Sequence, residues 1–298
     1  MKKNLKNVLY TAAVVGVAST FIFASAHATT DPVEEVKNPT DHHVPLPLTA
    51  NFAGEKAPLD VIDVKERFDR EMIINANLHS STTLVIKRAE RYFPIIEPIL
   101  KKNNIPDDFK YLCVIESTLS NVVSSAGASG FWQFMKGTAG EYNLVVDEYI
   151  DERYHLEKAT EAACKYFKDA KARFGSWTMV AAAYNRGMAG MTKAMNSQYV
   201  DNYYDLFLNQ ETSRYVFRIL AMKEIMTNPQ KYGYDIPKSE KYPPIPMRTI
   251  TLDKDIEDLP MFAIEQGSNY KLLKLYNPWL VNTNVKTKGK TYTIELPR

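Results

Sequence analysis

Apolar residues recur every three to four positions between residues 61 and 235 of this chain. This spacing places them on one face of an amphipathic helix, and no run alternates with a period of two for long enough to indicate a sheet. Glycines and a proline between the periodic segments predict where helices end. We therefore expect an all-helical domain over residues 61–235. Its predicted helices cover residues 64–78, 83–103, 106–119, 159–174, 177–195 and 213–227.

The C-terminal stretch, residues 249–298, has a different pattern. Residues 249–252 and 291–296 alternate β-branched with polar or charged side chains, as short strands do. Between them, Asp258 is placed to cap one short helix, and a second helix is predicted at residues 269–276. We predict a small α+β domain with the order strand, helix, helix, strand.

The segments that flank these domains lack such periodicity. Residues 236–248 contain the run Tyr-Pro-Pro-Ile-Pro, which favours a stiff, extended linker. Residues 29–60 are rich in Pro, Asp, Thr and Asn and predict a loosely ordered leader. We expect two domains joined by this linker and preceded by the leader.

Residues 1–28 have the pattern of a cleaved export signal. Three lysines precede a short apolar stretch, and the segment ends in Ala-His-Ala, with small residues two apart. A membrane anchor is the alternative, but the apolar stretch is short for a span and contains polar side chains. No later segment approaches ~18 uninterrupted apolar residues. We therefore expect a protein that is soluble outside the cytoplasm and has no membrane contact after cleavage.

Composition narrows the classes of protein further. Of the 298 residues, 45% are hydrophobic and 24% are charged, which is typical of a globular protein. The net charge of +2 offers no basic surface, so we expect no nucleic-acid partner. Cys113 and Cys164 are too few for a disulfide scaffold, and both pairing and buried free thiols stay open. Motifs for nucleotide, zinc-peptidase and serine-hydrolase chemistry are absent, so neither a metal nor a cofactor is expected.

Glu116 is the first candidate for chemistry. In the helix predicted at residues 106–119, Phe109, Leu112 and Cys113 share one face, and Glu116 falls on that face one turn later. The carboxyl group therefore points where an apolar residue is expected, near the negative end of the helix dipole. Both effects raise its pKa, so it could protonate a sugar leaving-group oxygen near neutral pH. The alternative is a structural glutamate that forms an ion pair at the helix end.

Two more segments suit a carbohydrate site. The small residues 126–130 let backbones approach closely, and they precede an aromatic stretch with Gln133, whose amide can bind sugar hydroxyl or acetamido groups. Further on, the alanines 181–183 allow close helix packing, so that Tyr184 and Asn185 could reach a shared cleft. The alternatives are a tight turn followed by core aromatics, and a core tyrosine next to a helix cap.

Three fragments follow one another in a characteristic order. They are ESTLSNVVSSAGASGFWQFMKGTA from residue 116, AAAYNRG from residue 181 and ETSRYVFRILAMKEI from residue 211. Together they resemble the lytic murein transglycosylases of the soluble-lytic-transglycosylase superfamily, most closely the membrane-bound D-type group. The resemblance implies a goose-lysozyme-like helical fold, a periplasmic, wall-associated protein, and peptidoglycan glycan strands as substrate. Residues 249–298 resemble a LysM module, a family that binds N-acetylglucosamine-containing chains, and a structural cap on the catalytic domain is the alternative.

The resemblance also implies roles for single residues. By matching position, Glu116 is the single catalytic acid and base. The residues implied to bind the substrate are Ser124, Gln133, Met135, Tyr184, Asn185, Glu211 and Tyr215. The chain departs from the family in two places, because the segment that leads to Ser124 is shorter by about one residue and Lys136 replaces a common proline.

The implied mechanism uses one carboxylate, and no other acid occurs between Glu116 and Glu141. Glu116 would protonate the oxygen that leaves C1 of N-acetylmuramic acid, while the substrate's acetamido group stabilises the positive charge. The resulting carboxylate would then deprotonate the 6-hydroxyl, which closes on C1 to give a 1,6-anhydro end. A lysozyme-type hydrolase that uses water and a non-catalytic cell-wall-binding protein are the two alternatives.

Overall fold

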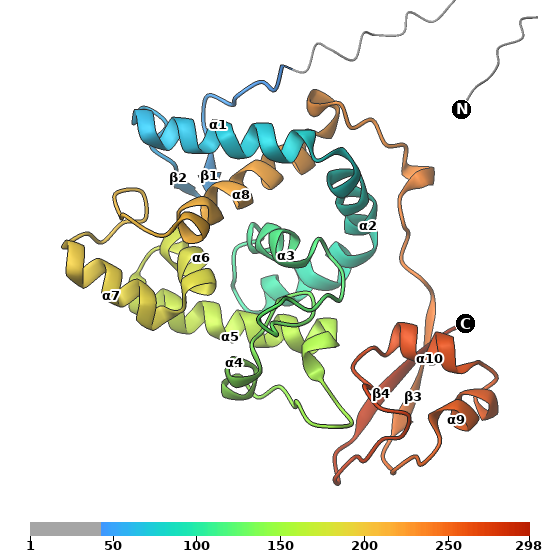
Figure 1. Ribbon diagram of the computed structural model, residues 1–298. Coiled ribbons are helices and arrows are strands. Elements are labelled where there is room, and N and C mark those ends of the chain that lie inside the picture. The colour runs from blue at the N-terminus through green and yellow to red at the C-terminus, as the bar shows by residue number, and fades with distance from the viewer. Residues whose placement is uncertain (1–42) are drawn as a thin grey trace, which may run out of the picture. The chain divides into compact units, whose positions relative to one another are not determined.

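The computed structural model describes residues 43–298, and most of their regular structure is helical (Figure 1). The helices are α1 (Ile62–Asn77), α2 (His79–Lys102), α3 (Phe109–Ser117), α4 (Lys136–Glu141), α5 (Leu156–Phe174), α6 (Trp177–Arg186), α7 (Met188–Gln198), α8 (Gln210–Thr227), α9 (Leu259–Glu265) and α10 (Tyr270–Tyr276). The strands are β1 (Asn51–Phe52), β2 (Glu55–Lys56), β3 (Met247–Leu252) and β4 (Tyr292–Pro297). This composition confirms the prediction of a mainly helical protein. The predicted signal at residues 1–28 and the first part of the leader lie outside the described residues.

The last part of the predicted leader, residues 43–60, differs from the loosely ordered segment that we expected. β1 and β2 form a short antiparallel hairpin, and Phe52 is fully buried in the core of the helical domain. Glu55 accepts hydrogen bonds from the backbone amides of Trp177 (2.7 Å) and Thr178 (2.8 Å) at the start of α6. Trp177 and Thr178 lie far from Glu55 in the chain, so the local composition of residues 43–60 does not predict this packing.

All six helices predicted for the helical domain are present, and one of them is divided. The segment predicted as a single helix at residues 177–195 forms α6 and α7, which are separated at Gly187. Gly187 has a φ of 80°, which glycine adopts without steric cost and which interrupts the helical backbone. α5 ends at Gly175, as expected, with a left-handed φ of 71°.

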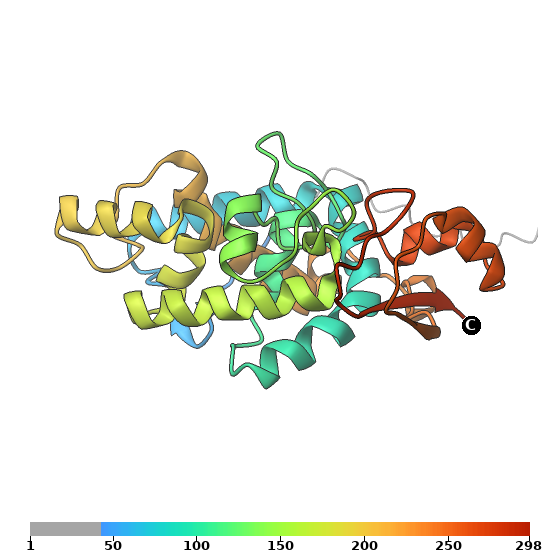
Figure 2. The same cartoon turned by 90° about the horizontal axis from the view of Figure 1, so that it is seen from below.

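α3 lies at the centre of the helical domain, with α1, α2, α5 and α8 around it (Figure 1). Every residue of α3 is fully buried except Lys110 and Glu116, which are partly buried, and this fits the strongly apolar sequence of the helix. α8 packs against α1, α3 and α6, and the long helix α5 crosses the domain (Figure 2). Within residues 43–298, no helix combines the length and the apolar character needed to cross a membrane.

The C-terminal residues form the small α+β domain that the sequence predicts. β3 and β4 pair antiparallel, and α9 and α10 come between them in the chain and contact each other. The Asp258 carboxylate caps α9 by accepting a hydrogen bond from the backbone amide of Met261 (2.9 Å), and Asn269 caps α10 in the same way. A core of its own holds this domain together. That core includes Leu252, Leu259, Ala263, Leu273, Leu280, Val285, Ile294 and Leu296.

Candidate active site

Glu116 lies in the last turn of α3, where this helix meets α8. The Tyr215 hydroxyl on α8 donates a hydrogen bond to Glu116 Oε1, although the two residues are 99 positions apart in the chain. One turn further along α8, Arg218 donates from Nη2 to the backbone carbonyl of Ile115 (3.1 Å). The carboxyl group is therefore held at the contact between two helices.

Burial raises the pKa of Glu116 from its ordinary value of 4.5 to about 7. The hydrogen bond from Tyr215 and the positive charge of Arg218 oppose this rise because both favour the carboxylate, whereas the negative charge of Glu211 adds to it. The prediction of a raised pKa at this position is confirmed. At neutral pH both protonation states are populated, so the group can donate a proton and later accept one.

Tyr184 and Tyr215 bring two phenol groups close to Glu116. Tyr184 belongs to α6, and its hydroxyl donates to the backbone carbonyl of Trp132 (2.6 Å). Burial raises the pKa of both tyrosines well above 10, and the negative charge of Glu116 adds to the rise. Both phenols therefore stay protonated at neutral pH and act as hydrogen-bond donors.

Asn185 and Glu211 join the end of α6 to the start of α8. Asn185 donates from Nδ2 to Glu211 Oε1 (3.1 Å), and its Oδ1 accepts from the Thr212 hydroxyl (2.8 Å). Asn209 caps α8 through the backbone amide of Thr212 (3.1 Å). Tyr215 follows Glu211 by four positions, which places both on one face of α8. Asn185, Glu211 and Tyr215 therefore lie in the same part of the helical domain.

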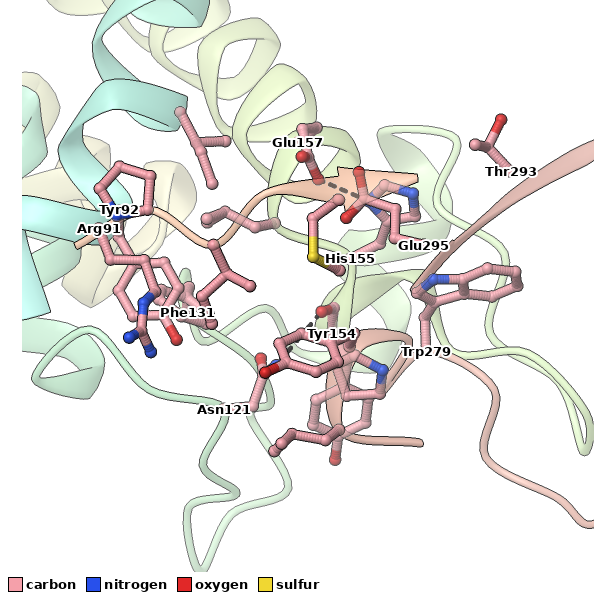
Figure 3. A pocket seen from close by; sticks show the side chains of 18 of the residues that line it. Arg91, Tyr92, Asn121, Phe131, Tyr154, His155, Glu157, Trp279, Thr293 and Glu295 are labelled. Carbon is pink, nitrogen blue, oxygen red and sulfur yellow. Dashed lines mark hydrogen bonds and ion pairs between the residues drawn. The ribbon is translucent and has the colours of Figure 1, made fainter. Parts of the chain in front are cut away.

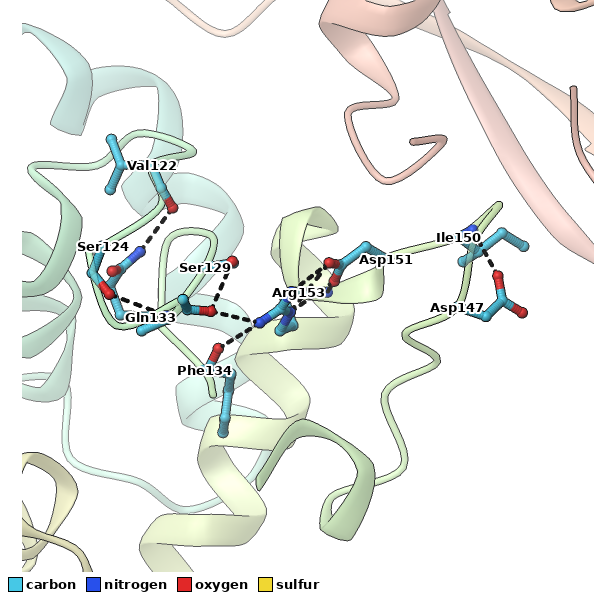
Figure 4. A network of polar contacts seen from close by, with 11 residues as sticks. Val122, Ser124, Ser129, Gln133, Phe134, Asp147, Ile150, Asp151 and Arg153 are labelled. Atoms are coloured by element: carbon cyan, nitrogen blue, oxygen red, sulfur yellow. Dashed lines mark hydrogen bonds and ion pairs between the residues drawn. The ribbon is translucent and has the colours of Figure 1, made fainter. Parts of the chain in front are cut away.

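Ser124 and Gln133 lie in the segment between α3 and α4 that we call the 121–134 loop (Figure 4). Ser124 Oγ accepts a hydrogen bond from a backbone amide of the same loop (3.0 Å). The Gln133 side-chain amide donates to the carbonyl oxygens of Val122 (2.9 Å) and Gly130 (2.8 Å). These contacts hold the loop in its own fold, and sugar binding by Ser124 and Gln133 stays a prediction.

The stretch at residues 131–135 is divided between core and surface. Its three aromatic side chains are buried, which agrees with the core alternative for them, and Trp132 Nε1 donates to Thr160 Oγ1 (2.8 Å). Met135 instead exposes 46% of its surface, so it is accessible to a ligand. Its role in binding substrate stays a prediction.

Two arginines that are not among the predicted site residues complete this region. Arg218 follows Tyr215 by three positions on α8, so helical spacing within the third fragment could have placed it beside Glu116. Arg153 is only 9% exposed and forms an ion pair with Asp151 (2.7 Å). No periodicity or motif marks Arg153, because its other partners lie in the irregular 121–134 loop.

A separate pocket of about 350 Å³ lies between the helical domain and the C-terminal domain (Figure 3). Residues of α2, the start of α5, the linker, α10 and β4 line it. In its wall the rings of His155 and Trp279 stack with centroids 5.7 Å apart, and His155 Nδ1 lies 3.0 Å from Glu157 Oε2. Burial raises the pKa of Glu295 in the same wall. Glu116 does not line this pocket, although Asn121 and Phe131 of the 121–134 loop do.

The described residues contain neither a metal site nor a disulfide. Within residues 43–298, His, Cys, Asp and Glu form no group of three that could hold a metal ion. Cys113 and Cys164 are both buried free thiols. Burial raises the pKa of Cys164 to about 12 and that of Cys113 well above its ordinary value, so both thiols stay protonated and unreactive.

Two family models match this chain. Residues 93–207 match the transglycosylase SLT domain, and residues 248–298 match the soluble lytic transglycosylase C-terminal LysM-like domain. The chain therefore contains an SLT transglycosylase domain followed by a LysM-like domain. Both matches confirm the resemblances drawn from the three fragments and from the C-terminal residues.

Curated relatives point in the same direction. They include the membrane-bound lytic murein transglycosylase D of Escherichia coli strain K12 and that of Escherichia coli O6:H1 strain CFT073. Each is 26% identical to this chain over 252 residues, which are 82% of this chain and 54% of the relative. The chain is thus homologous to these proteins and spans about half of their length.

Proposed function

We propose that this protein is a peptidoglycan lytic transglycosylase, a lyase that cleaves the β-1,4 bond between N-acetylmuramic acid and N-acetylglucosamine without water. The product is a 1,6-anhydromuramyl end. The observation that carries the proposal is Glu116, a carboxyl group with a pKa of about 7 that receives a hydrogen bond from Tyr215 and lies inside the matched SLT domain. The printed names of the two relatives support the same activity.

In this mechanism Glu116 acts first as an acid and then as a base. Its protonated form donates a proton to the glycosidic oxygen, and the bond between that oxygen and C1 of N-acetylmuramic acid breaks. The acetamido group of the substrate stabilises the positive charge at C1. The Glu116 carboxylate then removes the proton of the 6-hydroxyl, whose oxygen bonds to C1. Glu116 thus recovers its proton, and no water is consumed.

Hydrolysis by two carboxylates, as in lysozyme-type enzymes, is the competing reaction. Such enzymes hold two carboxyl groups about 5–10 Å apart, on either side of the scissile bond. Glu211 is the acid whose charge acts on Glu116, but it is exposed and accepts a hydrogen bond from Asn185. No other acid occurs between Glu116 and Glu141 in the sequence, which favours the mechanism with one carboxylate.

The predicted substrate residues are assigned to two sides of the reacting bond. Those on α6 and α8 would contact the sugars next to Glu116, with the protonated phenols and the amide as hydrogen-bond partners. They are Tyr184, Asn185, Glu211 and Tyr215. Those in or next to the 121–134 loop would contact the glycan strand from the other side. They are Ser124, Gln133 and Met135.

We assign the remaining parts of the chain accordingly. Residues 61–235 would carry out catalysis, and residues 236–248 would link them to a LysM-like domain at 249–298 that binds N-acetylglucosamine-containing chains. The signal at residues 1–28 would direct export, so that the enzyme acts on the cell wall in the periplasm. The LysM-like match and the basic, then apolar, start of the chain support these assignments.

Digestion of purified murein sacculi, followed by mass spectrometry of the released muropeptides, tests the proposed function. Anhydro products are lighter by one water than the reducing ends that a hydrolase leaves. Glu116→Gln should abolish release and keep the fold, while Glu66→Gln on the exposed surface of α1 should retain full activity. Reducing ends would establish the hydrolase instead. Binding of sacculi without release of any product would indicate a non-catalytic wall-binding protein.

A further inference from the structure

We propose that Arg153 is a positioning residue that holds the 121–134 loop, and with it Ser124 and Gln133, in the conformation that binds substrate. The inference rests on the proposed function, because the loop acquires its role in that reaction. Arg153 is buried and lies outside the three fragments that resemble the family. It therefore adds a residue to the site rather than restating a predicted one.

The Arg153 guanidinium ties two points of the loop together (Figure 4). Its Nη1 donates to the carbonyl oxygens of Gly127 (3.0 Å) and Phe134 (3.2 Å). Gly127 belongs to the turn that starts at Ser124, and Phe134 ends the loop. The loop contains neither a helix nor a regular strand, so its shape is fixed by its own hydrogen bonds together with these two charge-assisted bonds from Arg153.

Asp151 orients the guanidinium toward the loop. Nε and Nη2 of Arg153 donate to the two carboxylate oxygens of Asp151, at 2.9 and 2.7 Å, in a forked pairing. The backbone amide of Asp151 in turn donates to the carbonyl of Trp279 (2.9 Å), and the neighbouring Ile150 is buried in the core of the C-terminal domain. The C-terminal domain thus supports the loop through Asp151 and Arg153.

The main chain of Arg153 also lies against the loop. Gly130 has a φ of 82°, and a Cβ atom at this position would lie 1.9 Å from the Arg153 carbonyl oxygen. Only glycine permits this approach. A lysine in place of Arg153 would keep the charge but could not reproduce the fork that reaches Asp151 and the loop together.

The contacts of Arg153 are separate from the acid–base chemistry. Its side chain binds Asp151, Gly127 and Phe134, whereas Glu116 is held by groups of α8. Loss of the guanidinium should therefore weaken substrate binding through the loop and leave the pKa of Glu116 unchanged. A positioning role predicts a change in KM, with kcat and its pH dependence preserved.

Steady-state kinetics of the full chain on soluble glycan strands test this prediction. In Arg153→Met, KM should rise about tenfold while kcat changes by less than about twofold. Arg153→Lys should recover part of the loss, because its ammonium group still donates hydrogen bonds but lacks the planar fork. Arg173→Met, at an exposed arginine of α5, is the matched control and should keep both constants.

A purely structural role would give a different result. It would reduce the folded fraction, which lowers the apparent kcat and leaves KM unchanged, and this outcome would overturn the proposal. If Arg153→Met does not fold, Arg153→Lys carries the same comparison of KM with kcat.

Amide hydrogen exchange tests the role of Arg153 in the 121–134 loop without relying on the proposed function. If the unmodified protein releases no anhydro product, the proposed function fails, but the loop can still be examined. In the Arg153 variants, amides of the 121–134 loop should exchange faster, while those of α3 and α8 keep their rates. Unchanged exchange in the loop would show that Arg153 does not position it.

Discussion

Replacement of Glu116 by glutamine should stabilise the folded protein above pH 7. In the folded state, burial gives this carboxyl group a pKa of about 7, whereas in the unfolded chain it ionises near 4.5. Between these two values the unfolded state has released the proton and the folded state has kept it. Stability therefore falls as pH rises through this interval, and glutamine removes the loss because it carries no charge.

The size of the effect follows from the two pKa values. Each pH unit between them is worth about 1.4 kcal/mol. The interval from 4.5 to about 7 therefore corresponds to about 3 kcal/mol at pH 8, and to less than about 0.5 kcal/mol at pH 4, where both states hold the proton. The Tyr215 hydroxyl can still donate to the glutamine side-chain oxygen, so that hydrogen bond is retained.

Urea unfolding at pH 4 and pH 8, followed by tryptophan fluorescence, measures this difference as a shift in the midpoint. Glu66→Gln, on the exposed surface of α1, is the matched control and should leave the midpoint unchanged at both pH values. Equal midpoints for Glu116→Gln and the unmodified protein at pH 8 would show that the folded protein does not raise the pKa of Glu116. Activity on sacculi should be lost in the glutamine variant at every pH.

Three further changes test other contacts. Tyr215→Phe removes a hydroxyl that favours the Glu116 carboxylate, so the pKa of Glu116 should rise further and the pH–activity profile on sacculi should move to higher pH; an unmoved profile would argue against the bond. Burial alone would raise the pKa of Glu55, but the hydrogen bonds that it accepts at α6 lower it. Glu55→Gln should therefore cost about 1–2 kcal/mol in thermal unfolding at pH 7, and the loss should shrink as the pH falls below 4.5 and through the lowered pKa of folded Glu55. Gly130→Ala should displace the 121–134 loop and lower both the melting temperature and activity, because its Cβ would collide with the Arg153 carbonyl; unchanged values would contradict this close approach.

The secondary structure was largely predictable because its signals are local. Apolar periodicity located the long helices, and Asp258, which was predicted as a helix cap, accepts a hydrogen bond from the amide three residues on. Gly187 is one of the glycines expected to stop a helix, but the predicted segment 177–195 runs through it because the apolar period continues through both α6 and α7. A change in chain direction leaves no trace in such a period.

The candidate site was predictable only in part. The three fragments identified Glu116, and helical periodicity placed it on the buried face of α3. The contacts that surround it were not predictable, because Arg218, Arg153 and Glu55 find their partners in distant segments. Periodicity reports which face of a helix is buried, and it does not report which group will lie opposite.

Local patterns in the sequence were enough to predict the helical class, the strand–helix–helix–strand order of the C-terminal domain and the apolar setting of Glu116. The packed structure was needed for the pKa of that carboxyl group, since α8 covers it with a tyrosine 99 positions away. It was needed equally for the support that Arg153 gives to the 121–134 loop. The free energy of a charged group depends on the solvent and partners around it in space, and those are set by long-range packing.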